Sequence, residues 1–402
     1  EKRGEGKHTV QYKLRDWVFS RQHYWGEPIP IIHCPEHGPV PVPEEQLPLE
    51  LPYVEKYQPT GTGESPLASI PDWVNTTCPT CGKPAKRETD TMPNWAGSSW
   101  YFLRYCDPHN DTVFAYREKL DAWLPVDIYN GGMEHTTLHL LYSRFWYKFL
   151  SDEGLVPGTE PYRHRHSHGV VLASDSRKMS KSFGNVVNPD ALVVQYGADA
   201  LRLYELFMGP FEDAIPWSPQ GIVGTRRFLD RVWALGQVLL KEKTGPATAD
   251  VLRPLHQTIR NVGEDLEAFK FNTAVSSLMS CLNVFTDHPE QVDRTAFSTY
   301  LTVLAPFAPH LAEELWRMFG HEESIFRTSW PSYDSRIAAD EEIEIAVQIN
   351  GKVRGRIRVP AALPEEKVHA RAVVLPNVAR YLEGKTIRKR IYVPGRLVNF
   401  VV

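Results

Sequence analysis

A short polar segment between an apolar run and a helix start constrains this chain most strongly. Residues 177–185 read Arg-Lys-Met-Ser-Lys-Ser-Phe-Gly-Asn, after the apolar run at 169–172 and before Asn188-Pro189-Asp190. Proline suits the first turn of a helix, so the pattern predicts a strand, a loop and a helix in succession. Two ammonium groups and two hydroxyls in one loop suit a polyanion such as a triphosphate, although most loops of this composition are merely solvated.

The composition is that of a globular protein with several domains. At 402 residues, with 42% hydrophobic and 23% charged residues, the chain is long enough for roughly two to four domains. No apolar run approaches the ~20 residues of a membrane span, and we expect no signal peptide, because no apolar core follows the charged start. Five cysteines, four of them in metal-like spacing, favour a reducing cytoplasm over disulfides. We expect a cytoplasmic protein without membrane contact; the missing initiator methionine indicates a processed, excised or incomplete chain.

Two knuckles have metal-binding spacing. They read Cys34-Pro-Glu-His37 and Cys78-Pro-Thr-Cys81-Gly, and the segment between them is rich in proline. A two-residue spacing lets a tight turn aim both side chains at one ion, and two such turns complete a tetrahedral zinc shell. Because a proline-rich segment builds little core of its own, a structural zinc would staple it. His33 competes with His37 as the fourth ligand, and a ribbon that has lost its metal is the alternative.

A Gly-Gly turn marks a second candidate site. The apolar start at 126–130 leads into Gly131-Gly132 and a predicted helix that continues to about Phe149. Glycines allow a ligand to approach the backbone closely. His135 and His139 are four residues apart and are expected on one helix face. Because Glu134 precedes the first histidine, the zinc-protease order His-Glu-x-x-His is absent. A pocket at the carboxyl end of a strand fits better; a core histidine pair is the alternative.

An aromatic and serine-rich stretch at 90–105 adds three candidates. Trp95, Ser98 and Tyr101 recur at a spacing of three, so they could share one side of a helix start. Ser98 and Ser99 are predicted to cap a helix that begins near Trp100. Ordinary aromatic core is the alternative interpretation.

The chain becomes helical after residue 216. Apolar residues step by three and four between 252 and 269, which indicates an amphipathic helix. Further helices are predicted at 219–241, 273–286, 291–305 and 309–319. This pattern is typical of an all-α bundle, whose apolar residues we interpret as core.

The last sixty residues predict a small basic α+β domain. Apolar residues alternate at 343–349 and 353–359 around Asn350-Gly351, which indicates a hairpin. A two-residue turn would mix apolar and basic side chains on one face, so we expect a three-residue connection or an adjacent bulge. The expected pairs are Ile349–Val353, Val347–Gly355, Ile345–Ile357 and Ile343–Val359.

Basic residues gather in this last domain. Residues 341–402 hold 12 Lys and Arg against 6 Asp and Glu, a net +6 in a chain of net −4. A solvated face is one interpretation, and local contact with a polyanion is the other. The outward basic row comprises Lys352, Arg354, Arg356 and Arg358, with Lys385 and Arg388 nearby.

In this order and spacing the motifs resemble the bacterial leucyl-tRNA synthetases, which are class I aminoacyl-tRNA synthetases. Ser20-Arg21-Gln22 and Trp25-Gly26 resemble the re-entry into the catalytic domain of leucyl-, isoleucyl- and valyl-type enzymes. Isoleucyl and valyl relatives share the lysine loop but differ at the Gly-Gly-x-Glu-His position. The resemblance extends over essentially the entire chain, although the family often has Phe where Trp95 stands and cysteine where His37 stands.

The resemblance implies ATP-dependent ligation of leucine to tRNA(Leu), with Mg²⁺ accompanying ATP and a structural Zn²⁺. It places Trp95, Ser98, Tyr101, His135 and His139 in the leucine pocket. It assigns ATP contacts to Gly131, Gly132, Glu134, Val171, Lys178, Met179, Ser180, Lys181 and Ser182, with Lys178 and Lys181 catalytic. It also implies that the C-terminal basic residues contact the tRNA elbow.

The expected fold is multidomain, α/β plus all-α. The domains are a re-entry segment at 1–30, a zinc-ribbon-like insertion at 31–89, the second half of a Rossmann-type catalytic domain with the lysine loop at 90–216, an anticodon-binding-type helical bundle at 217–335 and an α+β domain at 340–402.

The family also uses a His-x-Gly-His-type motif on an N-terminal half-Rossmann fold, together with an editing domain, and the sequence shows neither. We therefore expect a C-terminal portion or a split subunit, whose further partner is a separate chain with the missing parts. The alternatives are a non-catalytic tRNA-binding module and an isoleucyl or valyl specificity.

Overall fold

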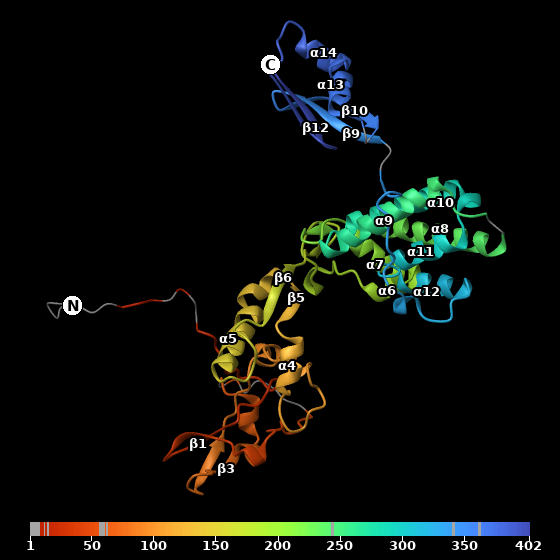
Figure 1. Cartoon of the computed structure of the whole chain (residues 1–402). Coiled ribbons are helices and arrows are strands. Elements are labelled where there is room, and N and C mark those ends of the chain that lie inside the picture. The colour runs from red at the N-terminus through yellow and green to blue at the C-terminus, as the bar shows by residue number, and fades with distance from the viewer. Residues whose placement is uncertain are drawn as a thin grey trace, which may run out of the picture. The chain divides into compact units, whose positions relative to one another are not determined.

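The computed structural model describes residues 9–11, 13, 16–55, 61, 63–242, 245–339, 342–360 and 363–402. It divides into two compact units, Glu1–Gly169 and Val170–Val402 (Figure 1). The first eight residues of the expected 1–30 segment, and residues 340 and 341 at the expected start of the last domain, lie outside the described residues. Within the described part, no helix is long and apolar enough to cross a bilayer.

The first unit contains a four-stranded antiparallel sheet over the predicted insertion. Its strands are β1 (Ile31–Cys34), β2 (Gly38–Pro41), β3 (Asn75–Thr77) and β4 (Pro84–Arg87), in the order β2-β1-β4-β3. Each cysteine knuckle forms the turn of a hairpin and ends in a glycine, Gly38 or Gly82, with φ of +70°. Glycine adopts this left-handed conformation without steric cost, so both turns can close tightly behind their ligands.

The described part of the predicted re-entry segment packs against residues 91 and 92. Arg21 and Thr91 exchange two backbone hydrogen bonds of 2.9 and 3.0 Å. Gly26 has φ of +152°, and a Cβ there would contact the Met92 carbonyl and the Thr91 side chain. Only glycine fits this position, which accounts for the glycine in Trp25-Gly26.

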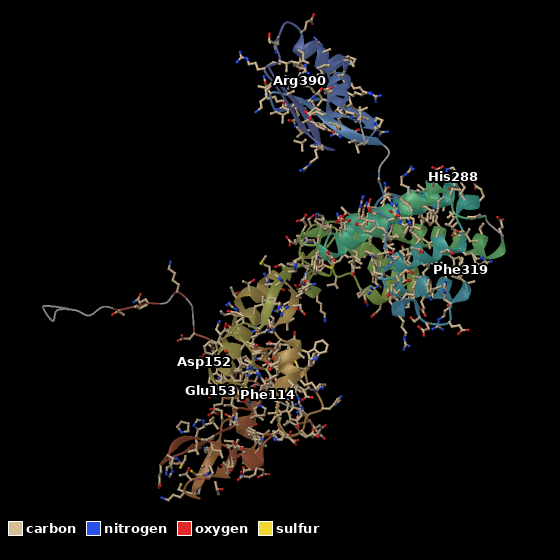
Figure 2. The ribbon with its side chains drawn as sticks, viewed as in Figure 1. Phe114, Asp152, Glu153, His288, Phe319 and Arg390 are labelled. Carbon is tan, nitrogen blue, oxygen red and sulfur yellow. The ribbon has the colours of Figure 1, made fainter. Side chains whose placement is uncertain are left out.

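A parallel β-α-β element follows the sheet. β5 (Val126–Gly131) and β6 (Tyr162–Ser167) pair in parallel, and α5 (His139–Asp152) connects them. The short helices α2 (Asn94–Ser98), α3 (Tyr101–Arg104) and α4 (Arg117–Trp123) complete this part. Its core includes Phe102, Leu120 and Tyr147, and Phe114, labelled in Figure 2, packs against Trp100 with ring centroids 5.2 Å apart.

The lysine loop belongs to the second unit. It follows β7 (Val171–Leu172), which pairs in parallel with β8 (Ile215–Pro216). The helices α6 (Pro189–Tyr196) and α7 (Ala198–Phe207) lie between these strands in the chain. Asn188 caps α6 by accepting a hydrogen bond from the Asp190 N–H at 3.0 Å. The predicted order of strand, loop and helix is confirmed.

The helices between residues 219 and 318 form the predicted bundle (Figure 1). They share one buried core, which also takes in residues of α7, such as Leu203 and Tyr204. The observed helices agree with the predicted ranges to within a few residues. They are α8 (Pro219–Lys241), α9 (Ala249–Glu267), α10 (Phe271–Asp287), α11 (Arg294–Leu304) and α12 (Pro309–Met318).

The C-terminal domain is a four-stranded sheet with two helices on one face. β9 (Glu342–Ile349), β10 (Lys352–Pro360), β11 (Lys389–Val393) and β12 (Leu397–Val401) lie in the order β10-β9-β12-β11. The helices are α13 (Glu365–Val373) and α14 (Pro376–Leu382). Gly355 lets this helix layer approach β10, since a Cβ there would lie 3.0 Å from Leu375.

The hairpin in this domain has the predicted bulge. Asn350 and Gly351 form a two-residue turn with φ of +48° and +79°, and the register shifts between Val353 and Gly355. Beyond the shift, Val347–Gly355, Ile345–Ile357 and Ile343–Val359 pair as expected. The expected Ile349–Val353 pair is wrong, because the turn keeps Ile349 opposite Lys352 and the extra residue is Arg354.

Candidate functional site

A cavity of about 340 Å³ brings the predicted amino-acid pocket together within the first unit. It lies at the end of β5, where the strand meets its Gly-Gly turn. All five residues that were predicted to contact leucine line this one cavity. The lining residues are Trp95, Ser98, Tyr101, Tyr129, Asn130, Gly131, Gly132, His135, His139, Leu140 and His168.

Hydrogen bonds connect four side chains of this pocket. The Nδ1 atom of His139 lies 3.0 Å from the Ser98 hydroxyl, and its Nε2 atom lies 2.6 Å from the Tyr129 hydroxyl. The hydroxyls of Tyr129 and Tyr101 are 2.8 Å apart. Burial lowers the pKa of His139, and His135 lowers it further. His139 is therefore neutral at physiological pH, with one ring nitrogen donating and the other accepting.

His135 has a different environment from His139. Its ring meets Trp95 edge-on, with centroids 5.6 Å apart. The Nδ1 atom of His135 is buried and has no hydrogen-bond partner among the described residues. Buried polar atoms without partners are uncommon in native proteins, so a ligand is the natural partner. Beside it, a Cβ on Gly132 would meet the Glu134 carboxylate, which would have to turn aside.

Two local predictions around the pocket are wrong. His135 and His139 do not share a helix face: His135 lies in a 3₁₀ turn at Met133–Thr137, and His139 begins α5. Leu138, with φ of −119° and ψ of −109°, breaks the helix between them. Ser98 and Ser99 do not cap the helix near Trp100 either. Both hydroxyls instead donate to the carbonyl of Trp95, the second residue of α2.

The lysine loop is closed by its own polar groups. Asn185 accepts a hydrogen bond from the Ser180 N–H at 2.8 Å, and its amide lies 3.4 Å from the Lys178 carbonyl. The hydroxyls of Ser180 and Ser182 are 2.7 Å apart. Gly184 closes the turn with φ of +64°. The sequence reasoning did not assign Asn185, although it is the residue that fixes the loop backbone.

Two cations of this loop remain available. Arg177 is paired with Asp175 at 2.6 Å, whereas Lys178 and Lys181 are exposed and have no partner among the described residues. Met179 packs against the helical core and anchors the loop. Val171, predicted to lie beside adenine, is 38% exposed. The loop therefore presents two free ammonium groups from an anchored backbone.

The four predicted metal ligands form one cluster. The Sγ atoms of Cys34, Cys78 and Cys81 and a ring nitrogen of His37 all lie within 4.8 Å of one another. The Cys34 Sγ–Cys81 Sγ distance is 3.8 Å, and the Cys34 Sγ–His37 Nδ1 distance is 3.6 Å. A tetrahedral zinc with Zn–S bonds of about 2.3 Å separates its ligand atoms by about 3.8 Å, so the cluster fits that ion.

The backbone around Cys34 favours the thiolate, which is the form that binds a metal. Backbone N–H groups, chiefly that of His37, hold the pKa of the Cys34 thiol below its usual value. The competing His33 is directed elsewhere, because its Nε2 atom lies 2.8 Å from the Glu88 carboxylate. His37 is therefore the fourth candidate ligand.

The basic row of the C-terminal domain differs from the expected one. Arg354 does not point outward: its guanidinium lies 4.0 Å from the Tyr381 ring centroid and donates to the Tyr381 hydroxyl at 3.0 Å. Arg356 pairs with Glu344 at 2.7 Å. Lys352 and Arg358 are exposed without partners among the described residues, as are Lys385 and Arg388. The bulge explains the direction of Arg354, since an extra residue escapes the alternation of the strand.

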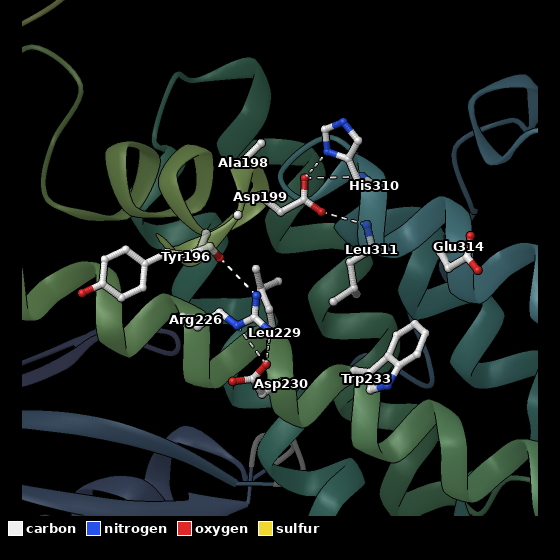
Figure 3. Close-up of a pocket in the computed structure, with 12 residues that line it drawn as sticks. Tyr196, Ala198, Asp199, Arg226, Leu229, Asp230, Trp233, His310, Leu311 and Glu314 are labelled. Carbon is white, nitrogen blue, oxygen red and sulfur yellow. Dashed lines mark hydrogen bonds and ion pairs between the residues drawn. The ribbon is translucent and has the colours of Figure 1, made fainter. Parts of the chain in front are cut away.

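A larger hollow of about 440 Å³ lies in the second unit, between α7, α8 and the start of α12 (Figure 3). Asp199 reaches across it: its carboxylate accepts hydrogen bonds from the Leu311 N–H at 2.7 Å and the His310 N–H at 3.3 Å, and contacts the His310 ring. Ala308, which precedes α12, offers no side-chain cap. Asp199 therefore caps α12 from a distant part of the chain.

Replacing Asp199 with alanine is expected to destabilise the contact between α7 and the start of α12 by about 2 kcal/mol, because a helix cap and charge-assisted hydrogen bonds are lost. Hydrogen exchange of the His310 and Leu311 amides should accelerate roughly 30-fold, as that energy implies. His310→Ala is the matched control, because it removes the ring and keeps both backbone bonds. Equal exchange rates in the two variants would contradict the capping role.

Comparisons with known proteins identify the family. The family model for tRNA synthetases class I (I, L, M and V) matches residues 6–218, more than half of the chain. The model for the anticodon-binding domain of tRNA ligase matches residues 249–369. The chain therefore belongs to the class I tRNA synthetases of this group.

Within the family the similarity is to leucine–tRNA ligases. The leucine–tRNA ligase of Alkaliphilus oremlandii (strain OhILAs) is 55% identical over 402 residues, which are 100% of this chain and 50% of that protein. The crystal structure of a ternary LeuRS-tRNA-LeuAMS complex from Agrobacterium radiobacter K84 matches with a TM-score of 0.85 and 37% identity. That match covers 100% of this chain and 52% of the other. The resemblance to leucyl-tRNA synthetases is confirmed, and the chain spans about half the length of the relative.

Proposed function

We propose that this chain carries the leucine pocket, the lysine loop and tRNA-binding parts of a cytoplasmic leucine–tRNA ligase. In the first step, a carboxylate oxygen of leucine attacks the α-phosphorus of ATP, which is bound with Mg²⁺. The bond to pyrophosphate breaks, and leucyl-adenylate forms. In the second step, a terminal ribose hydroxyl of tRNA(Leu) takes the leucyl group and AMP leaves. The protein holds the reactants in place and neutralises charge, and no side chain forms a covalent intermediate.

Each candidate residue has a role in this scheme. Trp95, Ser98, Tyr101, His135 and His139 enclose the leucine side chain. Gly131 and Gly132 let ATP approach the backbone beside Glu134. Lys178 and Lys181 stabilise the departing pyrophosphate, supported by the Ser180 and Ser182 hydroxyls. Val171 lies beside adenine, and Met179 is a further ATP contact in the loop.

The observation that carries the proposal is the cavity at the end of β5. Residues 95–101, 129–132 and 135–140 meet there, although nothing in their local spacing requires it. An ATP–pyrophosphate exchange assay tests the proposal, with this chain alone and with the N-terminal half of a leucine–tRNA ligase added. Exchange with leucine but not with isoleucine or valine is expected when both halves are present. Binding of tRNA without any exchange would favour the non-catalytic module.

The first unit has an exposed apolar surface that suits contact with the expected partner chain. The β5–β6 sheet has two strands among the described residues, and isolated two-stranded sheets are marginal in water. Ile128 on β5 is 49% exposed, and Phe145 and Phe149 on α5 are 66% and 50% exposed. We propose that the other half of the catalytic domain, with parallel strands, covers this surface. The division of the chain into the five predicted domains belongs to the same proposal.

The C-terminal domain is proposed to bind the tRNA backbone through its unpaired cations. A Lys352→Ala/Arg358→Ala double variant should weaken tRNA binding and flatten its salt dependence by about two units of slope, one per lost phosphate contact. Titrating tRNA affinity against salt measures this slope for the whole chain.

Arg354→Ala is the matched control for this prediction. Its guanidinium is held by Tyr381, so the salt slope should stay unchanged. Arg356, which is paired with Glu344, should contribute less to the salt slope than Arg358 does. A double variant with the slope of the unmodified chain would mean that the strand is only a solvated face.

A further inference from the structure

The Tyr129 hydroxyl contacts both His139 and the Tyr101 hydroxyl. Among the described residues of the pocket, no other side chain makes both contacts. The Tyr129 hydroxyl lies 2.6 Å from Nε2 of His139 and 2.8 Å from the Tyr101 hydroxyl. It comes from β5, whereas Tyr101 comes from α3 and His139 from the start of α5. The hydroxyl therefore joins three elements that are separate in the sequence.

The directions of these hydrogen bonds follow from the ends of the network. The Ser98 hydroxyl donates to the Trp95 carbonyl at 3.3 Å, so its oxygen is left to accept from Nδ1–H of His139. The neutral ring then carries no proton on Nε2, which must accept from the Tyr129 O–H. The Tyr129 oxygen in turn accepts from the Tyr101 O–H. In this arrangement every proton has one acceptor.

We propose that Tyr129 is a positioning residue that holds His139 as the Nδ1–H tautomer and makes the pocket wall discriminate against polar side chains. This inference rests on the proposed function and deepens it. With both ring nitrogens engaged, His139 presents only carbon atoms to the amino acid. An aliphatic side chain such as that of leucine loses nothing against this ring, whereas a hydroxyl finds no acceptor on the His139 ring.

Removing the Tyr129 hydroxyl changes that wall. In Tyr129→Phe, Nε2 of His139 becomes a free acceptor inside a half-buried pocket. Leaving a buried acceptor unpaired is unfavourable, so a ligand hydroxyl that pairs with it gains relative to leucine. Pockets that can hydrogen-bond a ligand group discriminate by that group much more strongly than apolar pockets do.

The tautomer is tested directly on the purified full chain. Nitrogen NMR of ¹⁵N-histidine-labelled protein, with His139→Gln to assign the signal, should show the Nδ1–H form in the unmodified chain. A mixture of tautomers is expected in Tyr129→Phe. Tyr162→Phe is the matched control, because its ring lies 4.3 Å from that of Tyr129 while its hydroxyl bonds Ser143 and not His139. An Nε2–H form in the unmodified chain overturns the proposal, even if a variant fails to fold.

Discrimination is tested with both halves of the enzyme present. The affinity ratio between leucine and a γ-hydroxylated leucine should fall by about tenfold in Tyr129→Phe and stay unchanged in Tyr162→Phe. An unchanged ratio in Tyr129→Phe overturns the specificity role. Failure of the unmodified protein to bind leucine would instead overturn the proposed function, since the tautomer measurement needs no ligand.

Discussion

Lys181→Ala is expected to slow leucyl-adenylate formation by about 10²–10³-fold, the usual effect of removing one donor that stabilises transition-state charge. Leucine affinity should stay nearly unchanged, because the leucine pocket lies at the end of β5 and not on the lysine loop. The Lys181 ammonium is exposed and unpaired among the described residues, so its charge is free to act on pyrophosphate. Single-turnover release of pyrophosphate, with the N-terminal half supplied, measures the effect.

Two controls separate the charge from general damage. Lys181→Arg keeps the charge and should recover part of the rate. Lys119→Ala removes an exposed lysine of α4 and should leave the rate unchanged. A Lys181→Ala protein with the unmodified single-turnover rate would exclude a role for this lysine in the leaving-group step.

Local sequence patterns predicted the features that depend on local spacing. The cysteine knuckles, the strand before the lysine loop and the helix after Asn188 follow from neighbouring residues, and the structure contains all of them. Asn185 escaped prediction because the bonds of its side chain to Ser180 and Lys178 exist only once the loop has closed. An asparagine in a polar loop has many other partners in the unfolded chain.

The contacts within the pocket could not be predicted from local patterns. The sequence predicted Ser98 and His139 as pocket residues, but their 3.0 Å contact joins residues that are 41 positions apart. Tyr129 was missed because alternation along a strand shows which residues share a face, and not which phenol meets a histidine. The spacing of His135 and His139 predicted one helix face, which the chain abandons at Leu138.

The C-terminal hairpin shows the same limit on a smaller scale. Asn350-Gly351 by itself predicts a regular two-residue hairpin. Aligning the apolar faces of the two strands predicted an additional bulge, and the bulge is present. Matching faces could not predict the direction of Arg354, since the bulged residue belongs to neither face. Its stacking on Tyr381 depends on α14, which lies more than twenty residues further along the chain.

The insertion at 31–89 is expected to bind one zinc ion per chain and to lose its fold when that ion is removed. Two of the five buried residues in the core around its knuckles, Cys34 and Cys78, are themselves candidate ligands. Little apolar contact would remain to hold the two knuckles together. Zinc binding contributes on the order of 10 kcal/mol to the folding of small zinc domains, far more than a core of this size provides.

Cys78→Ser should therefore abolish zinc binding and expose the segment between the knuckles to proteolysis. Elemental analysis of protein prepared without chelator measures the metal, and limited proteolysis reports the fold. Cys106→Ser is the matched control, because this thiol donates to the Phe102 carbonyl and lies outside the cluster. His33→Ala is a second control, since His33 contacts Glu88; both controls should retain the ion. A metal-free but protease-resistant unmodified chain would show that the ribbon stands without zinc, and the cysteines would then be only buried core.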